Sequence, residues 1–321
     1  MKKLTSIILS ILLLNGCQEK EQIPKVAILQ DKPQEWADAL KLGFIDGLEQ
    51  KGYIIGTDII IVPRSGASDP VTFSTIAEGF VKGDYPIIYT LGTQSTQEIF
   101  NLTKDKNIIF GAVTDPVAAG FFKDNLSSPI ANITGTQDLW PYPAQFDLIQ
   151  ALLPNLKTIG IIYNPSEVNS QVSVEFISNE CAKRKIQLEK RTVSSESDIL
   201  QATSALVNQK VDILFIPADN TAQTAATSII AICDKNNIPV FTGINGIVEL
   251  GAIATVGTNY YELGKVNAQQ AIEILFNEKK AKDISVSIAE KGDIYINLQA
   301  TQKFGIIVPD SILKVAFKIY K

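Results

Sequence analysis

The sequence predicts an α/β fold with two similar lobes, because one strand–loop–helix plan occurs twice along the chain. The segment 157–178 begins with the apolar, β-branched run Thr158–Tyr163, which is typical of a strand buried on both faces. Asn164-Pro165-Ser166 ends this strand, since proline lacks a backbone donor and disfavours helical geometry in the residue before it. A polar loop and a helical pattern to about Lys185 complete half of a βαβ unit.

The first part of the chain follows the same plan. Lys25–Leu29 reads as a strand, Gln30–Glu35 as a polar loop, and Trp36–Lys51 as a helix with apolar residues three and four positions apart. A second correspondence relates 84–110 to 212–241, since both read strand, polar loop, helix and strand. Two copies of one plan, separated by about half of the chain, indicate two similar lobes.

The other elements are predicted from the same periodicities. In the first half we expect strands and helices at Asp58–Val62, Val71–Lys82, Ile87–Tyr89 and Asn107–Phe110, and an extended crossing segment at Asn132–Gln137. In the second half we expect them at Tyr142–Leu153, Glu189–Val193, Ser197–Gln209, Ile213–Ile216, a helix ending at Lys235, Ile238–Phe241 and Ile253–Val256.

The last part of the chain is predicted to cross between the lobes again. A helix at Glu262–Asn277 is expected to return to the first lobe, followed by strands at Ile284–Ile288 and Asp293–Asn297 and a tail, Ala300–Tyr320, that packs on the second lobe. Crossings near 130–135, 256–259 and 283–288 would form a three-segment hinge. The predicted division is 24–132 plus 257–283 for the first lobe, and 133–256 plus 284–321 for the second.

Composition excludes several classes of function. The chain has 321 residues, a formal net charge of −5 and no histidine. No Lys/Arg-rich run is present, so we expect no nucleic-acid partner. Histidine is the commonest general base and the commonest metal ligand. We therefore predict no metal and no cofactor.

No catalytic constellation is visible either. The sequence has no G-x-S-x-G elbow, no phosphate-binding G-x-x-x-x-G-K-[ST] loop, and no histidine to activate Cys181 or Cys233. Buried free thiols are the simpler interpretation of these two cysteines, and they can pair only if their helices lie side by side. Glu167 and Asp219 are acids of the kind that glycosidases use, but their spacing does not indicate one. We predict that the chain is not an enzyme.

The first 17 residues are predicted to be a signal peptide. Met1-Lys2-Lys3 is a positive region and Ile7–Leu14 an apolar region too short to span a membrane in the mature protein. Leu14-Asn15-Gly16-Cys17 resembles a bacterial lipobox, in which Cys17 becomes the lipidated first residue. Residues 18–23 would then be a linker. The chain is expected to be extracytoplasmic and anchored to the membrane by lipid.

Polar clusters follow the predicted strands in both lobes. In parallel sheets, ligands bind at the carboxyl ends of the strands, so loops from two facing lobes predict a binding cleft. Gly92–Thr96 opens a helix and offers free N–H groups and hydroxyls to a carboxylate or phosphate; the alternative is ordinary N-capping by Thr93 or Ser95. The candidate ligand-binding residues are Thr93, Gln94, Ser95, Thr114, Asp115, Glu167, Asn169, Ser170, Asp219, Asn220, Thr221 and Asn259.

Segments spread along the chain match one known family. They are VTDPVAAG (113–120), NITGTQDLWP (132–141), IGIIYNPSEVNS (159–170), VDILFIPADNT (211–221), IPVF (238–241), GAIATVG (251–257), YYELG (260–264) and INLQATQKFGIIVP (296–309). From Pro24 to its end, the chain resembles the lipoprotein substrate-binding components of ABC importers with the type I periplasmic-binding-protein fold. It is most similar to the branch that includes tryptophan- and tyrosine-binding members.

The resemblance implies two Rossmann-like lobes, joined by three crossing strands, that close over one ligand. The loop Gly92–Thr96 would hold the carboxylate of an amino acid, and Glu167, Asn169, Asp219 and Asn220 would face it from the other lobe. Thr114 and Asp115 would lie at the cleft edge. Two departures bear on the ligand side chain: Lys32-Pro33 stands where His-Pro is often found, and Asn259 stands where Asp is common.

We therefore predict a monomeric solute-binding lipoprotein that delivers a small, aromatic amino acid to an ABC permease and its ATPase. Trp36, Trp140 and Tyr142 are candidates for stacking on the ligand, or else for core positions. A branched aliphatic amino acid, a nucleoside or a sugar is the alternative ligand. A cell-envelope α/β transferase or glycosidase is the alternative class, and a transcription regulator of the same fold is opposed by the signal sequence.

Overall fold

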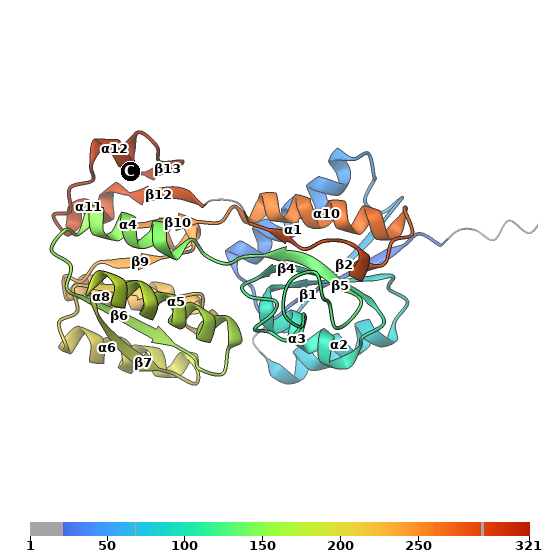
Figure 1. Cartoon of the computed structure of the whole chain (residues 1–321), viewed down its shortest axis with the longest axis horizontal. Coiled ribbons are helices and arrows are strands. Elements are labelled where there is room, and N and C mark those ends of the chain that lie inside the picture. Colours follow the sequence, from blue (N-terminus) through green and yellow to red (C-terminus); the bar gives the residue numbers. More distant parts are fainter. Residues whose placement is uncertain (1–21, 68, 290–291) are drawn as a thin grey trace, which may run out of the picture.

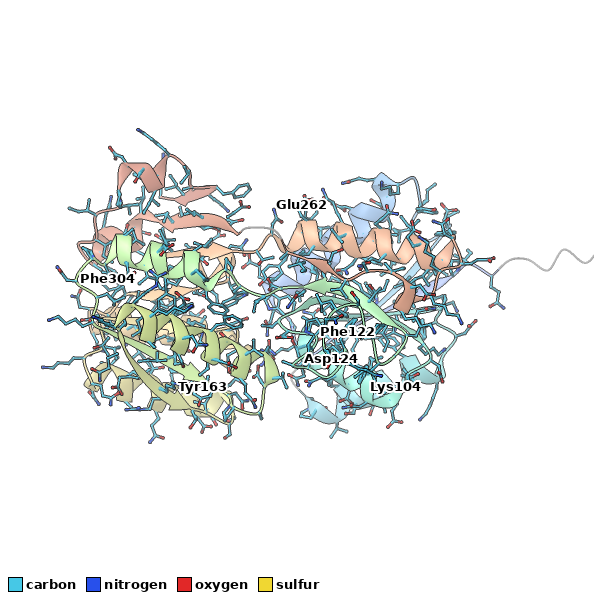
Figure 2. All side chains as sticks on the ribbon, viewed as in Figure 1. Lys104, Phe122, Asp124, Tyr163, Glu262 and Phe304 are labelled. Atoms are coloured by element: carbon cyan, nitrogen blue, oxygen red, sulfur yellow. The ribbon has the colours of Figure 1, made fainter. Side chains whose placement is uncertain are left out.

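The computed structural model describes residues 22–67, 69–289 and 292–321, and places them in two α/β lobes that lie side by side (Figure 1). Side chains fill the interior of both lobes; of those labelled in Figure 2, Phe122 is buried in the first lobe, and Phe304 is half-buried at the outer end of the second. The predicted signal peptide and the lipidation site Cys17 lie outside the described residues. Within them, no helix combines the length and apolarity needed to cross a membrane.

The first lobe is built on a six-stranded parallel sheet in the order β11-β5-β4-β3-β1-β2. Alternate residues of β1 pack on opposite faces: Val26 and Ile28 join one hydrophobic cluster, and Ala27 and Leu29 join another. Burial on both faces is what its uninterrupted apolar run predicts. The elements of this lobe are β1 (Lys25–Gln30), α1 (Glu35–Gln50), β2 (Ile60–Ser65), α2 (Pro70–Lys82), β3 (Ile87–Leu91), α3 (Gly92–Leu102), β4 (Asn107–Val113), β5 (Ile133–Gln137), α10 (Tyr260–Leu275), the 3-10 turn η2 (Ala281–Asp283) and β11 (Ser287–Ile288).

The second lobe holds a four-stranded parallel sheet, β7-β6-β8-β9, and a three-stranded sheet, β10-β12-β13. Its elements are α4 (Tyr142–Leu152), β6 (Thr158–Tyr163), α5 (Val168–Arg184), β7 (Gln187–Thr192), the 3-10 turn η1 (Glu196–Asp198), α6 (Ile199–Asn208), β8 (Ile213–Ile216), α7 (Asn220–Thr224), α8 (Ala226–Lys235), β9 (Val240–Thr242), α9 (Asn245–Glu249), β10 (Ala254–Gly257), β12 (Asp293–Asn297), α11 (Leu298–Lys303), α12 (Asp310–Leu313) and β13 (Lys318–Tyr320). Cys181 and Cys233 are buried free thiols.

The crossing segments correct the predicted lobe boundaries. The segments 133–137 and 287–288, assigned above to the second lobe, form β5 and β11 and extend the first sheet. They stay with it because each completes a row of backbone hydrogen bonds, and because Ile133 is buried in the core of the first lobe. The chain therefore leaves the first lobe after Gln137 and again after Ile288.

Helix α10 returns to the first lobe, as predicted, and packs along α1. The two backbones come very close, because a Cβ added to Gly43 would lie 1.9 Å from the carbonyl oxygen of Tyr261. Strand β2 is longer than predicted and includes Pro63. Proline is tolerated there because β2 is the edge strand, so its missing N–H interrupts no shared ladder.

Candidate functional site

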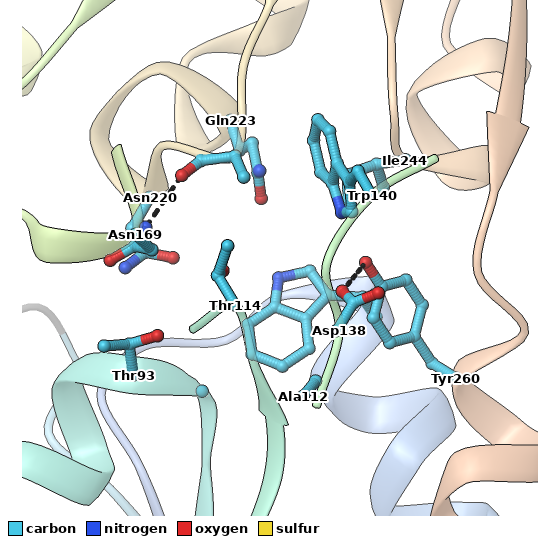
Figure 3. A pocket seen from close by; sticks show the side chains of 13 residues that line it. Thr93, Ala112, Thr114, Asp138, Trp140, Asn169, Asn220, Gln223, Ile244 and Tyr260 are labelled. Atoms are coloured by element: carbon cyan, nitrogen blue, oxygen red, sulfur yellow. Dashed lines mark hydrogen bonds between the residues drawn. The ribbon is translucent and has the colours of Figure 1, made fainter. Parts of the chain in front are cut away.

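A cavity lies between the lobes, lined by loops that follow the strands of both sheets (Figure 3). Its free volume is about 30 Å³, so the lining side chains are packed closely around it. The lining residues are Trp36, Gly92, Thr93, Ala112, Thr114, Asp138, Trp140, Asn169, Ala218, Asn220, Gln223, Ile244 and Tyr260.

One end of the cavity is the N-terminus of α3. The helix starts directly after β3, and Leu91 at the N-cap position supplies no side-chain hydrogen bond to the free N–H groups. Thr93 and Ser95 are buried in the first turn, and within the described residues Ser95 Oγ has no hydrogen-bond partner. An uncapped helix N-terminus beside an unpartnered buried hydroxyl is suited to an anion.

The second lobe presents amide oxygens to the same end. Asn169 Nδ2 donates to the carbonyl of Ala218 at 2.8 Å, and Gln223 Nε2 donates to the carbonyl of Pro217 at 3.1 Å. Because their N–H donors are used on the protein, both side chains keep their oxygens as acceptors. This part of the cavity therefore offers donors from α3 and acceptors from the opposite lobe.

The other end of the cavity contains a buried acid among aromatic rings. Asp138, only 4% exposed, accepts hydrogen bonds from Thr258 Oγ1 at 2.6 Å and Tyr260 Oη at 2.8 Å. Burial raises the pKa of the Asp138 carboxyl, and hydrogen bonds from Thr258, Tyr260 and the Trp140 side chain oppose the shift. Trp140 and Ile244 complete this end.

The Trp36 indole lies between the two ends. A Cβ added to Gly92 would be 2.9 Å from its Cη2 atom, and the ring centroids of Trp36 and Tyr260 are 5.7 Å apart. Figure 3 accordingly shows Thr93 and Asn169 on one side of the cavity and Asp138 and Tyr260 on the other. The cavity is thus polar at one end, aromatic along its length, and acidic at the far end.

A polar groove lies at the mouth of the cleft, outside the cavity. It is lined from the first lobe by Lys32, Gln94 and Glu98 and from the second by Glu167 and Glu196. A smaller pocket, here called the neck, shares Thr93 and Asn220 with the cavity and Lys32 and Gln94 with the groove, and Ser95 also lines it.

The predicted ligand-binding residues separate into three groups. Lining the cavity are Thr93, Thr114, Asn169 and Asn220; lining the neck or groove are Gln94, Ser95, Glu167 and Thr221; outside both are Asp115, Ser170, Asp219 and Asn259. In the last group, Asp115 accepts from the N–H groups of Val117 and Ala118, and Asn259 caps α10 by accepting from Glu262 N.

The two acids of the second lobe hold its loops together. Asp219 accepts from Asn164 N at 2.5 Å, Ser170 Oγ at 2.6 Å and Ala222 N at 2.7 Å. Glu167 accepts from Asn220 N and from Thr221 N and Oγ1. Burial and the charge of Glu167 raise the pKa of Asp219 to about 6. These contacts shape the loop that presents Asn169 and Asn220.

Sequence analysis missed Asp138, the residue that directly follows the predicted crossing segment Asn132–Gln137. It directly follows a strand of the first sheet, and its N–H donates to the carbonyl of Val113 at the end of the neighbouring strand. The rule used for the other loops would have found it, had 133–137 been recognised as a strand. Of the three aromatic candidates, Trp36 and Trp140 line the cavity, whereas Tyr142 is a core residue that donates to Ser173 and stacks on Phe176.

A two-lobed α/β protein with an enclosed cavity between its lobes belongs to the class of ligand-binding proteins with the type I periplasmic-binding-protein fold. A family model described as "ABC transporter substrate binding protein" matches residues 25–320. The chain therefore belongs to the ABC-transporter substrate-binding proteins. Members of this family act outside the cytoplasm and deliver a small molecule to an ABC permease.

Three relatives are similar over most of the chain. A tyrosine-binding protein of Clostridioides difficile (strain R20291) is 37% identical over 260 residues, which cover 81% of this chain and 74% of the relative. The structure of an ABC domain in complex with L-Trp, from Streptococcus pneumonia, is 29% identical with a TM-score of 0.88, over 92% of this chain and 99% of that one. The ligand-free, open structure of a substrate-binding protein with adhesive properties, from Clostridium difficile, is 32% identical, with a TM-score of 0.71. This match covers 93% of this chain and 100% of that one.

The two structural comparisons differ in a way that sequence does not explain. Identity and coverage are nearly equal, yet the TM-score falls from 0.88 for the L-Trp complex to 0.71 for the ligand-free, open protein. Both lobes contribute to the enclosed cavity described here. The arrangement of the two lobes is therefore more similar to that of the L-Trp complex than to that of the ligand-free, open structure.

Proposed function

We propose that the chain binds an aromatic L-amino acid in the interlobe cavity and delivers it to its permease. The main support for the proposal is that the two ends of the cavity differ chemically. One end is the uncapped N-terminus of α3 beside the Ser95 hydroxyl, which has no partner among the described residues. The other end is aromatic and is formed by Trp36, Trp140 and Tyr260. The tyrosine-binding relative and the L-Trp complex support the same class of ligand.

The carboxylate of the ligand lies at the N-terminus of α3. It accepts from the free N–H groups of the first turn and from the hydroxyls of Thr93 and Ser95. None of the described residues that line the cavity is a lysine or arginine, so the helix N-terminus supplies most of the compensating charge. Lys32 in the adjoining neck adds a favourable field.

The ammonium of the ligand lies next to the carboxylate, since one carbon carries both groups. Asn169 Oδ1 and Gln223 Oε1 face this position from the second lobe and accept its hydrogens. Glu167 lies behind Asn169, with Oε2 3.3 Å from Nδ2, and adds negative charge to this side. In this arrangement Asp219 acts indirectly, by fixing the loop.

The ring of the ligand then extends along Trp36 toward Trp140 and Tyr260. Contacts between aromatic rings contribute about 0.5–1.5 kcal/mol beyond the burial of area. An aliphatic side chain would bury area but lose these ring contacts. A sugar or nucleoside would leave the anion-binding end without a charged group to bind.

Calorimetry with related compounds tests the proposal. Tryptophan should bind at least ~30-fold more tightly than tryptamine or indole-3-propionate, because each analogue leaves one set of polar partners unmatched at a cost of about 2–5 kcal/mol. Leucine, uridine and glucose serve as comparison ligands. Equal affinity for tryptophan and its two analogues, or tighter binding of a comparison ligand, would refute an amino-acid site.

Lipid anchoring and the monomeric state are part of the same proposal. The support for anchoring is the apolar run Ile7–Leu14 followed by Gly16-Cys17. Acylation of Cys17 would hold the two lobes at the membrane surface beside the permease. A single chain contains both halves of the cavity, so binding needs no second copy.

A further inference from the structure

Asp138 lies at the end of the cavity that the zwitterion of an amino acid does not reach. The carboxylate and ammonium are close together, so both lie at the α3 end in the arrangement proposed above. The Trp36 indole separates that end from Asp138, because one edge of the indole meets Gly92 and its ring packs against Tyr260. Tyr260 in turn donates to Asp138 at 2.8 Å. The acid therefore faces the far edge of a bound ring.

Among the described residues that line the cavity, Asp138 is the one acid. Its hydrogen-bond donors Thr258, Tyr260 and Trp140 are all neutral, and no cation pairs with it among the described residues. An ionised carboxylate has about four acceptor positions, so these donors leave room for one more. A buried acid that is still short of donors is suited to accept a polar hydrogen from a ligand.

We propose that Asp138 accepts a hydrogen bond from the polar hydrogen on the ligand ring, the phenol O–H of tyrosine or the indole N–H of tryptophan. The inference rests on the function proposed above and adds a selectivity to it. Phenylalanine has no such hydrogen, and its ring would bury the carboxylate without giving it a further donor. A site built to bind a polar hydrogen discriminates strongly against an analogue that lacks it.

The surroundings hold Asp138 in place for this role. Its N–H continues the first sheet by donating to Val113 O, and Thr258 and Tyr260 fix its two carboxylate oxygens from the next crossing segment. Asp138 is thus a specificity-determining residue whose side chain is oriented before the ligand arrives. Hydrogen bonds to charged groups contribute about 1.5–3 kcal/mol, which corresponds to roughly 10- to 150-fold in affinity.

A ligand series on the unaltered protein gives the first test. Calorimetry should show tyrosine and tryptophan binding at least ~10-fold more tightly than phenylalanine, O-methyltyrosine and 1-methyltryptophan. If none of the five compounds binds, the proposed function fails along with this inference. If all bind with the same affinity, only the role of Asp138 is refuted.

Substitution gives the second test. Asp138→Asn should lower the affinity for tyrosine and for tryptophan to within a few-fold of the affinity for phenylalanine, which itself should stay unchanged. The matched control is Asp115→Asn, an acid outside the cavity, which should keep the discrimination. An equal loss for all three amino acids in Asp138→Asn, with the melting temperature retained, would instead place Asp138 at the ammonium or in the fold and overturn the inference.

Discussion

Lys32 and Glu196 form an ion pair across the mouth of the cleft, with Lys32 Nζ 3.2 Å from Glu196 Oε1. Lys32 belongs to the first lobe and Glu196 to the second, and 164 positions separate them in sequence. The lysine side chain is only 11% exposed, whereas the glutamate is 46% exposed. Since the residues come from different lobes, this pair can form only when the lobes are closed.

Removing this pair should speed the release of ligand. In Lys32→Gln or Glu196→Gln, we expect dissociation about two- to fivefold faster, the range for a partly exposed ion pair of up to about 1 kcal/mol. Stopped-flow fluorescence of Trp36 and Trp140 measures the rate. Glu78→Gln, which breaks the pair with Lys82 inside α2, is the control and should have no effect. The charge-exchanged double variant should restore slow release; a double variant as fast as the single ones would contradict the idea.

Ser95→Ala should weaken binding of ligand without weakening the fold. The hydroxyl has no hydrogen-bond partner in the described structure, so its removal deletes a buried unsatisfied group in the free protein. A bound carboxylate would lose one donor, which corresponds to roughly tenfold or more in affinity. Calorimetry gives the affinity and thermal melting the stability. Ser178→Ala on α5 is the control, because its hydroxyl already donates to Val174 O. A lower melting temperature with unchanged affinity would show that Ser95 is structural.

The pH dependence of stability should reveal Asp219. Its pKa is raised from 3.8 to about 6, so between those values the folded state binds a proton that the unfolded state does not. Its contribution to the free energy of unfolding therefore increases as the pH falls from 7 to 4, by up to about 3 kcal/mol. Urea unfolding of the parent and Asp219→Asn at pH 7 and pH 4 isolates this contribution. The gap between them should widen in favour of the parent at pH 4; a gap that narrows would show that the donors around Asp219 keep it ionised.

Ligand binding should make the molecule more compact. The arrangement of the two lobes matches the L-Trp complex better than the ligand-free, open relative. Each lobe supplies one set of partners for the ligand, so closure should depend on ligand bridging the lobes. Small-angle scattering of a chain lacking residues 1–17 should show a smaller radius of gyration with saturating tryptophan than without it. The same radius in both, with binding verified by calorimetry, would mean that the closed form does not require ligand.

Cys17→Ala should release the protein from the membrane fraction or leave it unprocessed. The reason is that acylation needs the cysteine thiol, while the apolar run Ile7–Leu14 still directs export. Partition into detergent, followed by immunoblotting, measures the anchor. Cys181→Ala, a buried thiol of the second lobe, is the control and should stay membrane-bound. Partition of the Cys17 variant equal to that of the parent would exclude lipid attachment at this residue.

The sequence predicted the fold better than the site. Apolar runs such as Thr158–Tyr163 marked the buried strands, since only a strand covered on both faces is apolar at every position. The same signal failed for 133–137, where threonines and a glycine form a fully paired strand. Their hydroxyls are satisfied locally: Thr134 donates to Ile284 O and Thr136 to Asn267 Oδ1. A polar strand of this kind reads as a loop in sequence.

Eight of the twelve predicted binding residues line the cavity, the neck or the groove, but the hydrogen-bond partners of the polar side chains were not predictable. Asp219 and Glu167 look like ligand groups in sequence, yet their carboxylates are occupied by backbone N–H groups and hydroxyls of the second lobe. Asn169 and Gln223 have less distinctive side chains and keep free acceptors in the cavity. Which side-chain oxygen remains free to bind a ligand depends on contacts between segments about 50 residues apart in the sequence. The periodicity of the sequence does not reveal these contacts.

The hydrogen bonds that Asp138 accepts from Thr258 and Tyr260 join two of the segments that connect the lobes. In a rotation, displacement grows with distance from the axis, so groups at the pivot hardly move while Lys32 and Glu196 travel farthest. When the lobes open, the residues around Asp138 therefore keep their positions relative to one another. Only the end of the cavity that binds the carboxylate and ammonium of the ligand is separated. A ligand would then bind ring first to this preassembled end, and closure of the lobes would bring the remaining partners to its carboxylate and ammonium.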